Sequence, residues 1–287
     1  MSRPIVSVPL VLPSPPAGER DGLRSHVHID SHCHLHDAAF DDLRGAIARA
    51  TEHNVWSTVA VGCDPDSNAR TLELAGRHGK CVRPAIGFHP DWLQLTDEDL
   101  EQVEAQVAAH HARLVALGEI GLPWYCLGGA EDATGVLTRG RKRLARLLGL
   151  ATRFDLPVIL HAPHGAAVSA LEALRRHGIE RAVFHWHKAP ADVTRDIVDA
   201  GYLISVTPEI VYRDRDREMV EAVPIESLLV ESDGPWPYRG EFGGLPSGPW
   251  VVARVVEEVA KIKRVPVDEA MAQICANTCE LFELPWA

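Results

Sequence analysis

Two histidines, His32 and His34, flank one cysteine at the end of the segment 27–35. The apolar residues Val27 and Ile29 followed by polar ones are typical of a buried strand that ends here. Side chains alternate along a strand, so both imidazoles point to the same side. Neutral histidine is the commonest nitrogen ligand of transition metals. The spacing therefore indicates a metal clamp, although such pairs also arise by chance in a chain with 15 histidines.

Four further apolar runs end in residues that bind divalent metals. These residues are Glu119, His161, His185 and Asp233. Each run alone is more often a core strand with a polar end than part of a site. In α/β proteins, however, the carboxyl ends of parallel strands meet where active sites are built. The six side chains together therefore predict a metal site at that face.

The elements that must position these residues alternate along the chain, without a repeat or a domain linker. The pattern predicts strands at 27–33, 56–61, 82–87, 114–119, 157–161, 181–185, 202–206 and 228–232. It predicts helices at 41–52, 67–79, 97–111, 137–154, 165–177, 191–200, 250–263 and 267–281, the last covering the outside or the lower mouth. Eight strands joined by crossover helices favour an α/β fold, a single (β/α)8 TIM barrel with the metal site at the C-terminal mouth of its strands.

Length and composition agree with one barrel domain, which we assign to residues 26–287 of the 287-residue chain. Residues 1–25 contain five prolines and are predicted to form an extension, either a flexible leader or an ordered edge. There is no apolar stretch long enough for a membrane span. The six cysteines form no CxxC pair, which favours a reduced, cytoplasmic protein.

The order of the motifs resembles the TatD family of metal-dependent deoxyribonucleases, from about Val27 to the C-terminus. The motifs are His32-Cys33-His34, Ile86-Gly87-Phe88-His89-Pro90, Gly118-Glu119-Ile120-Gly121-Leu122, Leu156-Pro157-Val158-Ile159-Leu160-His161, His185, Glu231-Ser232-Asp233-Gly234-Pro235 and Ala276-Asn277-Thr278-Cys279-Glu280-Leu281-Phe282. The resemblance implies the same barrel and a site for two divalent ions. In that site His32, His34 and Asp233 would hold one ion, His161 and His185 the other, and Glu119 would bridge them.

Two such ions suit phosphodiester hydrolysis because they activate a water and stabilise the attacking and leaving oxygens. Asp233 is the candidate that takes the proton of the attacking water, so Asp233 and Glu119 are the predicted catalytic residues. Structural zinc sites favour four closed ligands and cysteine, unlike this mixture of histidine and carboxylate. The donor set admits Zn²⁺, Mn²⁺ or similar ions, and Mg²⁺ stays open although it prefers oxygen ligands.

The departures from the family pattern lie outside the ligands. Pro123 replaces the usual acid after Gly-Glu-Ile-Gly-Leu, and Pro163 replaces the usual basic residue after His161. Candidate substrate contacts near the strand ends are His89, His164, His187, Lys188 and Arg239 for phosphate, and Trp186 and Trp236 for stacking on bases. Each could instead be a loop or packing residue. Glu231 could orient a ligand histidine. The metal ligands of the family are retained while the residues around them differ. This combination fits a hydrolase that binds its substrate differently from other members of the family.

The charge balance argues against a large duplex-binding surface. There are 29 Lys and Arg against 40 Asp and Glu, a net charge of −11, whereas duplex binders usually carry a basic stripe. The basic run 139–146 predicts a solvated helix face, with a phosphate-tracking or partner-docking face as the alternative. An acidic nuclease that holds one or two nucleotides at a pair of cations suits the trimming of strand ends.

Three functions remain open at this point. The first is a deoxyribonuclease, an exonuclease or phosphodiesterase whose partner is DNA, single-stranded or at its ends. The second is a metal-dependent hydrolase of a small amide or ester, favoured by the acidic charge and the lost basic residue. The third is a component of a multi-protein system, such as anti-phage defence, whose activity depends on a protein partner.

Overall fold

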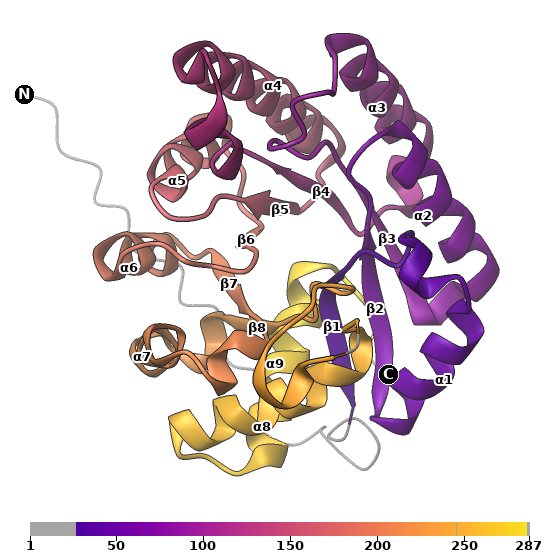
Figure 1. Cartoon of the computed structure of the whole chain (residues 1–287), viewed down its shortest axis with the longest axis vertical. Coiled ribbons are helices and arrows are strands. Elements are labelled where there is room, and N and C mark those ends of the chain that lie inside the picture. Colours follow the sequence, from indigo (N-terminus) through magenta and orange to yellow (C-terminus); the bar gives the residue numbers. More distant parts are fainter. Residues whose placement is uncertain (1–26, 245, 286–287) are drawn as a thin grey trace, which may run out of the picture.

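The structure, a computed structural model, describes residues 27–244 and 246–285, so the extension predicted at 1–25 lies outside the described residues. Eight parallel strands follow one another in chain order around a barrel (Figure 1). They are β1 His28–Cys33, β2 Val55–Val61, β3 Val82–Ile86, β4 Ala116–Gly121, β5 Val158–His161, β6 Ala182–Phe184, β7 Leu203–Val206 and β8 Leu228–Val230. The predicted (β/α)8 barrel is confirmed, and every strand lies within two residues of its predicted bounds.

The ring closes between β1 and the segment that continues β8. The backbone N–H of His34 donates to the carbonyl of Gly234 (2.8 Å), and the N–H of Asp233 donates to the carbonyl of His32 (3.0 Å). These two hydrogen bonds hold three of the predicted ligands beside one another.

Helices surround the strands (Figure 1). They are α1 Leu43–Glu52, α2 Pro65–His78, α3 Asp97–His110, α4 Ala133–Phe154, α5 Ala166–His177, α6 Ala191–Asp199, α7 Asp214–Ala222, α8 Val252–Lys263 and α9 Val267–Leu281. Helix α4 begins four residues before its predicted start, because Asp132 caps it by accepting from the N–H of Gly135 (2.8 Å). Helix α7 was not predicted, because its sequence DRDREMVEA has too few apolar residues for a helical period.

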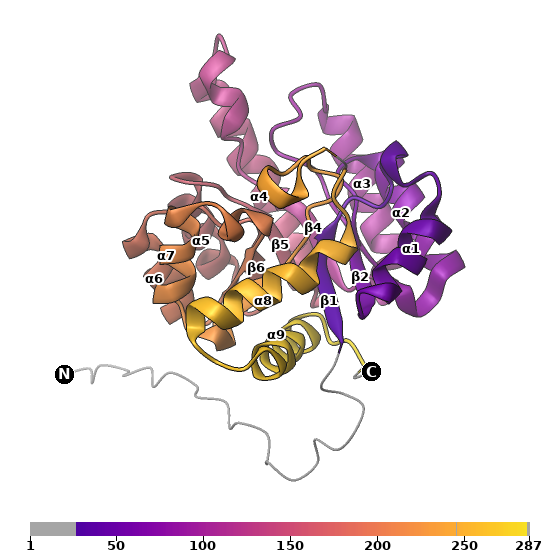
Figure 2. The same cartoon turned by 60° about the horizontal axis from the view of Figure 1, so that its bottom comes forward.

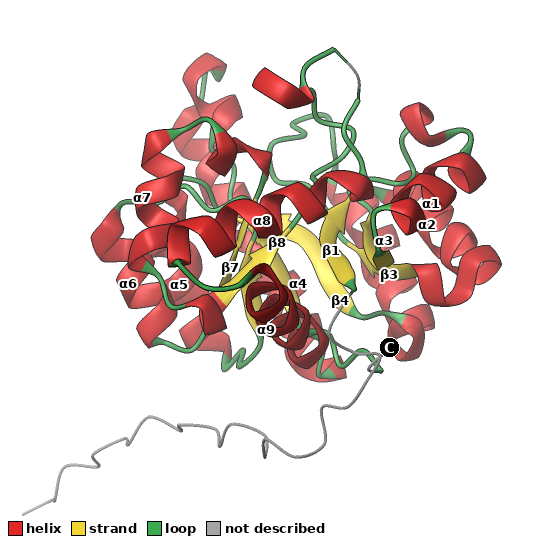
Figure 3. Cartoon of the chain, turned by 90° about the horizontal axis from the view of Figure 1, so that it is seen from below, coloured by secondary structure: helices red, strands yellow, loops and turns green. Residues whose placement is uncertain are grey.

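Helix α9 closes the lower end of the barrel, as Figures 2 and 3 show. Cys275 and Cys279, four residues apart on this helix, pack into one buried cluster with inward residues of the strands, among them Val59, Ile159 and Leu229. The two cysteines are thus core residues. Water is excluded from this end, so the other mouth carries the chemistry.

In β5 and β6 the inward-facing positions alternate and end in predicted ligands, whereas register shifts in β1 and β4 interrupt the alternation before His32, His34 and Glu119. Ile159 and Val183 belong to the inner core cluster, and His161 and His185 follow two positions later. Leu229 lies in the same cluster, and Asp233 follows it by four. Since side chains repeat every second residue, an apolar inner layer places the next inward residue at the upper mouth.

His28 begins β1 and is 8% exposed. Burial, aided by repulsion from His53, lowers the pKa of His28 from 6.5 to about 4. As the pH falls through that window the unfolded chain binds a proton that the folded chain does not, so stability falls by about 1.4 kcal/mol per pH unit from this residue. We expect His28→Gln to reduce the slope of unfolding free energy against pH by that amount, measured by urea titration. Parallel curves for the two proteins would refute it.

No helix in the described part of the chain is both long enough and apolar enough to cross a membrane.

Candidate metal centre

Four side-chain atoms from three strand ends converge at the upper mouth. His32 Nε2 lies 3.3 Å from His34 Nε2. Asp233 Oδ1 lies 3.5 Å from the first of these atoms and 3.3 Å from the second. Glu119 Oε2 completes the set at 3.5 Å and 3.7 Å from the same two nitrogens. Two imidazole nitrogens and two carboxylate oxygens at this separation can surround one cation.

The other oxygen of Glu119 faces a second set of atoms. Glu119 Oε1 lies 2.6 Å from His161 Nδ1 and 2.8 Å from His185 Nε2. His89 Nε2 lies 3.3 Å from the same oxygen. One carboxylate therefore directs one oxygen to each set of atoms, an arrangement that fits a bridge between two ions.

The donor atoms fit a divalent cation. Asp233 Oδ1 is buried and has no hydrogen-bond partner within the described residues. A buried carboxylate oxygen without a partner is costly, and a cation at this point would remove that cost. Groups of histidine and carboxylate able to hold a metal include His32, His34 and Glu119, and separately His89, Glu119 and His161.

Two glycines explain why the strands approach so closely at Glu119. A Cβ built on Gly121 would lie 1.9 Å from the carbonyl oxygen of His161. A Cβ built on Gly87 would lie 2.3 Å from the carbonyl oxygen of Glu119. Any side chain at either position would push neighbouring strands apart, so the glycines of the motif 118–122 and of the segment 86–90 have a packing role.

The carboxylate of Glu119 and the neighbouring histidines shift the pKa values of one another. Burial disfavours ionisation of Glu119, but the neighbouring histidines, His185 foremost, outweigh it and hold the pKa of Glu119 well below its usual range. Burial likewise opposes charge on His185, yet Glu119 and Glu231 raise the pKa of His185 well above its usual value. A cation that binds here therefore displaces a proton from His185.

Two buried carboxylates support the ligands from behind. Asp30 accepts from the backbone N–H groups of His32 (3.2 Å) and Ser232 (2.9 Å), which ties β1 to the end of β8. Glu231 Oε1 lies 3.4 Å from Nδ1 of His185, whose Nε2 faces the centre. The same Oε1 accepts the backbone N–H of Trp186 (2.7 Å), and Nδ1 of His185 makes no hydrogen bond within the described residues. Glu231 therefore lies beside a ligand histidine, and its orienting role stays a prediction.

Comparison with known proteins agrees with this geometry. A family model described as TatD related DNase matches residues 29–283. The chain belongs to this family. Escherichia coli K12 YjjV, described as an uncharacterized metal-dependent hydrolase, is 33% identical over 263 residues, 90% of this chain and 98% of YjjV. The human protein described as Deoxyribonuclease TATDN3 is 28% identical over 265 residues, 88% of this chain and 94% of TATDN3.

A solved structure shows the same fold. The crystal structure of E. coli YjjV has a TM-score of 0.81 to this chain at 31% identity, and the match covers 91% of this chain and 100% of that one. As a member of the TatD family, the chain is a metal-dependent hydrolase, and its histidine and glutamate clusters at the strand ends could hold a metal ion.

In this TatD-family hydrolase His89 lies inside the centre, while two other candidates line its rim. The backbone N–H of Asp91 donates to His89 Nδ1 (3.2 Å), so a neutral His89 carries its proton on Nε2, which faces Glu119. Burial lowers the pKa of His89, which favours that neutral form. Trp186 and Trp236 contact edge to face with centroids 5.1 Å apart, and Trp236 is 51% exposed.

The remaining candidate substrate contacts lie in different surroundings. Lys188 Nζ lies 3.0 Å from Glu209 and 4.0 Å from the Trp186 ring centroid, so its charge is already paired. His164 lines a groove of about 850 Å³ between α6 and α7. Arg239 is exposed beyond β8. His187 is 2% exposed and bonds to Thr194 of α6 (2.8 Å), so the structure does not bring it to the mouth.

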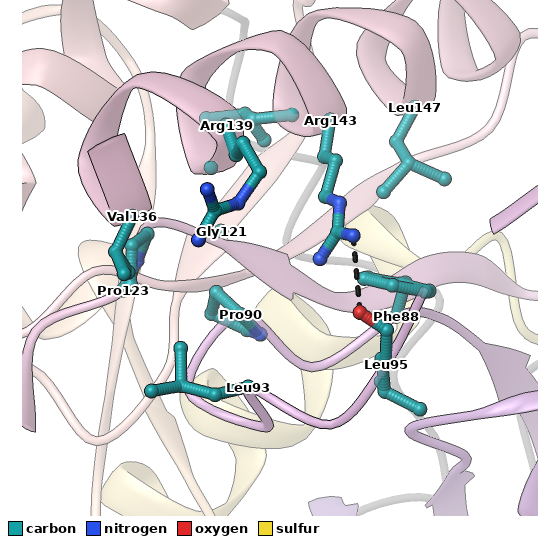
Figure 4. Close-up of a pocket in the computed structure, with 12 residues that line it drawn as sticks. Phe88, Pro90, Leu93, Leu95, Gly121, Pro123, Val136, Arg139, Arg143 and Leu147 are labelled. Carbon is teal, nitrogen blue, oxygen red and sulfur yellow. Dashed lines mark hydrogen bonds between the residues drawn. The ribbon is translucent and has the colours of Figure 1, made fainter. Parts of the chain in front are cut away.

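The basic run of the TatD-family chain fastens α4 to its neighbours. Arg146 makes two hydrogen bonds to Glu104 of α3 (2.8 Å and 2.7 Å). Arg143 bonds to Asp97 (2.9 Å) and to the carbonyl of Leu95 (3.0 Å). Figure 4 shows Arg143 and Arg139 beside a mostly apolar cavity of about 270 Å³. Two of the arginines are thus already paired with acids, which weakens the phosphate-tracking alternative.

Two side chains beside the ligands were not foreseen as part of the site. Asp91 Oδ2 lies 3.0 Å from His161 Nε2. Cys63 is buried, and its Sγ lies 3.6 Å from His34 Nδ1. The position of Asp91, two residues after His89 at a strand end, is the one sequence signal that could have indicated it.

Proposed function

We propose that this TatD-family hydrolase is a deoxyribonuclease that trims the ends of single-stranded DNA with two divalent ions. The carboxylate of Glu119 carries the proposal, because its two oxygens face two separate sets of donors. His32, His34 and Asp233 would hold one ion, and His161 and His185 the other. Bound there, two ions would activate a water and stabilise both oxygens of the displacement.

Four side chains of the site have separate roles in the proposed reaction. Asp233 Oδ1 has no hydrogen-bond partner among the described residues and lies in the mouth, where it can accept the proton of an attacking water. Glu119 stays ionised, because the neighbouring histidines, His185 foremost, hold its pKa low against the cost of burial. The Nε2–H of His89 can donate to a phosphate oxygen. The exposed face of Trp236 can stack on a base without selecting sequence.

The role of His89 gives a separate prediction. His89→Gln keeps a donor of similar reach but loses the fixed ring, and His89→Ala loses the donor. We expect the turnover number to fall by about 10²-fold in the alanine variant and less in the glutamine variant, because one hydrogen bond to the developing charge is lost. Steady-state rates on a labelled oligonucleotide measure this. If His89→Ala instead removed one bound ion, His89 would be a metal ligand.

The decisive experiment measures nucleotide release from 3′-labelled single-stranded DNA with Mn²⁺ or Mg²⁺. We expect release that is abolished by EDTA and restored by added ion, with Zn²⁺ tested in parallel. A folded protein that binds two ions and releases nothing from either strand end would refute the deoxyribonuclease proposal.

A second candidate is hydrolysis of a small amide or ester. Its support is that cations near the mouth are neutralised by acids, as Lys188 is by Glu209 (3.0 Å) and Arg215 by Asp216 (2.7 Å). Such a mouth attracts a polyanion weakly. A screen of small amides and esters with the same metal-loaded protein separates the two functions.

A further inference from the structure

Asp91 lies in the loop after β3 and reaches across two neighbouring loops. Its Oδ2 lies 3.0 Å from His161 Nε2, and both side chains are 11% exposed. Its Oδ1 accepts from the backbone N–H groups of Trp124 (2.7 Å) and Cys126 (3.3 Å). One carboxylate therefore joins the ends of three successive strands.

The two nitrogens of His161 face different partners. Nδ1 lies 2.6 Å from Glu119 Oε1, on the side of the metal centre, and Nε2 faces Asp91. A neutral imidazole carries one proton, and the hydrogen bond made by one nitrogen decides which nitrogen is free to bind metal. An ionised carboxylate only accepts hydrogen bonds, so Asp91 requires the proton on Nε2. Glu119 Oε1 can accept a proton from Nδ1 in the same way, so the lone pair of Nδ1 is directed at the centre once an ion replaces the proton between Nδ1 and Glu119.

We propose that Asp91 is a positioning residue of the second metal ion, which it serves by fixing the tautomer and ring orientation of His161. The inference rests on the proposed two-ion site. The backbone N–H of Asp91 also donates to Nδ1 of His89 (3.2 Å), so the same residue orients both histidines on this side of Glu119. Asp91 acts through these rings and takes no part in the reaction itself.

The variant Asp91→Asn isolates this role. Asparagine keeps an oxygen for the N–H groups of Trp124 and Cys126, so the loop contacts survive. Its amide nitrogen, however, donates to Nε2 of His161 and thereby favours the proton on Nδ1, where it blocks metal binding. The control is Asp97→Asn, the same substitution at a 66% exposed carboxylate that pairs with Arg143 at the start of α3.

Calorimetric titration of metal-free protein with Zn²⁺ gives the main measurement. We expect wild type and Asp97→Asn to bind two ions, whereas in Asp91→Asn one ion binds as before and the other about 10–100-fold more weakly. Equal affinities for both ions in Asp91→Asn would overturn the proposal. Loss of both ions with retained folding would also overturn it, because the effect would not be confined to His161.

Nitrogen-15 NMR of the histidine rings in wild type decides the matter even if the variant does not fold. We expect the Zn²⁺-loaded protein to show an Nε2–H proton on His161, assigned by its absence in His161→Gln. A ring that binds metal through Nε2 would overturn the proposal. Neither measurement uses DNA, so a protein that binds two ions but cuts no DNA would refute the proposed function and leave this inference standing.

Discussion

Asp233→Asn is expected to lower the rate of nucleotide release by about 10²–10⁴-fold, the range for loss of a positioned proton acceptor. The carboxylate has two tasks at one atom, since Oδ1 lies 3.5 Å from His32 Nε2 and 3.3 Å from His34 Nε2. An amide is a poor ligand and a poor base, so both tasks fail together. The variant should still fold, because asparagine has the same shape and the backbone bond from Asp233 to His32 remains.

Metal titration should show the loss confined to one ion. The second set of donors consists of His161, His185 and Glu119 Oε1. Within the described residues, Asp233 forms no hydrogen bond with any of them. We therefore expect Asp233→Asn to bind one ion normally and to lose the other. Asp41→Asn, at an exposed position, should match wild type in both assays. Near-normal nucleotide release by Asp233→Asn would exclude Asp233 as the proton acceptor.

The barrel and the meeting of His161 and His185 could be predicted from the sequence because both follow from simple periods, whereas register shifts in β1 and β4 interrupt the period before His32, His34 and Glu119. His161 and His185 each end an apolar strand with an inward residue two positions earlier, so a period of two and one common mouth bring them together. The division of the ligands into two sets around Glu119 was implied by the family resemblance alone. No spacing in the chain indicates which oxygen of Glu119 faces which histidine.

Residues outside the regular elements could not be predicted in this way. Asp91 lies in a loop, where no period links sequence to direction. Asp233 and Trp186 have positive φ angles of 43° and 38°, so the backbone turns away from the strand geometry that alternation assumes. His187, a candidate phosphate contact or packing residue in the sequence analysis, packs against Thr194 after this turn. Where the backbone turns in this way beside the site, the sequence pattern does not predict the direction of the side chains.

Glu119→Gln is expected to have the broader effect, because it is the one side chain common to both sets of donors. Its Oε2 lies 3.5 Å from His32 Nε2, and its Oε1 lies 2.6 Å from His161 Nδ1. An amide offers a single weak acceptor and presents N–H groups to the other set. We therefore expect both ions to be lost and nucleotide release to fall at least as far as in Asp233→Asn.

The comparison of these two variants tests the bridge itself. Metal content after dialysis against equal ion concentrations should be about two ions in wild type, one in Asp233→Asn and none in Glu119→Gln. Retention of one ion by Glu119→Gln would show that its carboxylate serves a single ion. The loss should not reflect unfolding, because the substitution removes a fully buried charge together with the larger of the two carboxylate effects that raise the pKa of His185. If Glu119→Gln is folded but binds no metal, Glu119 is a bridging ligand. If the variant is unfolded, Glu119 is needed for the fold itself.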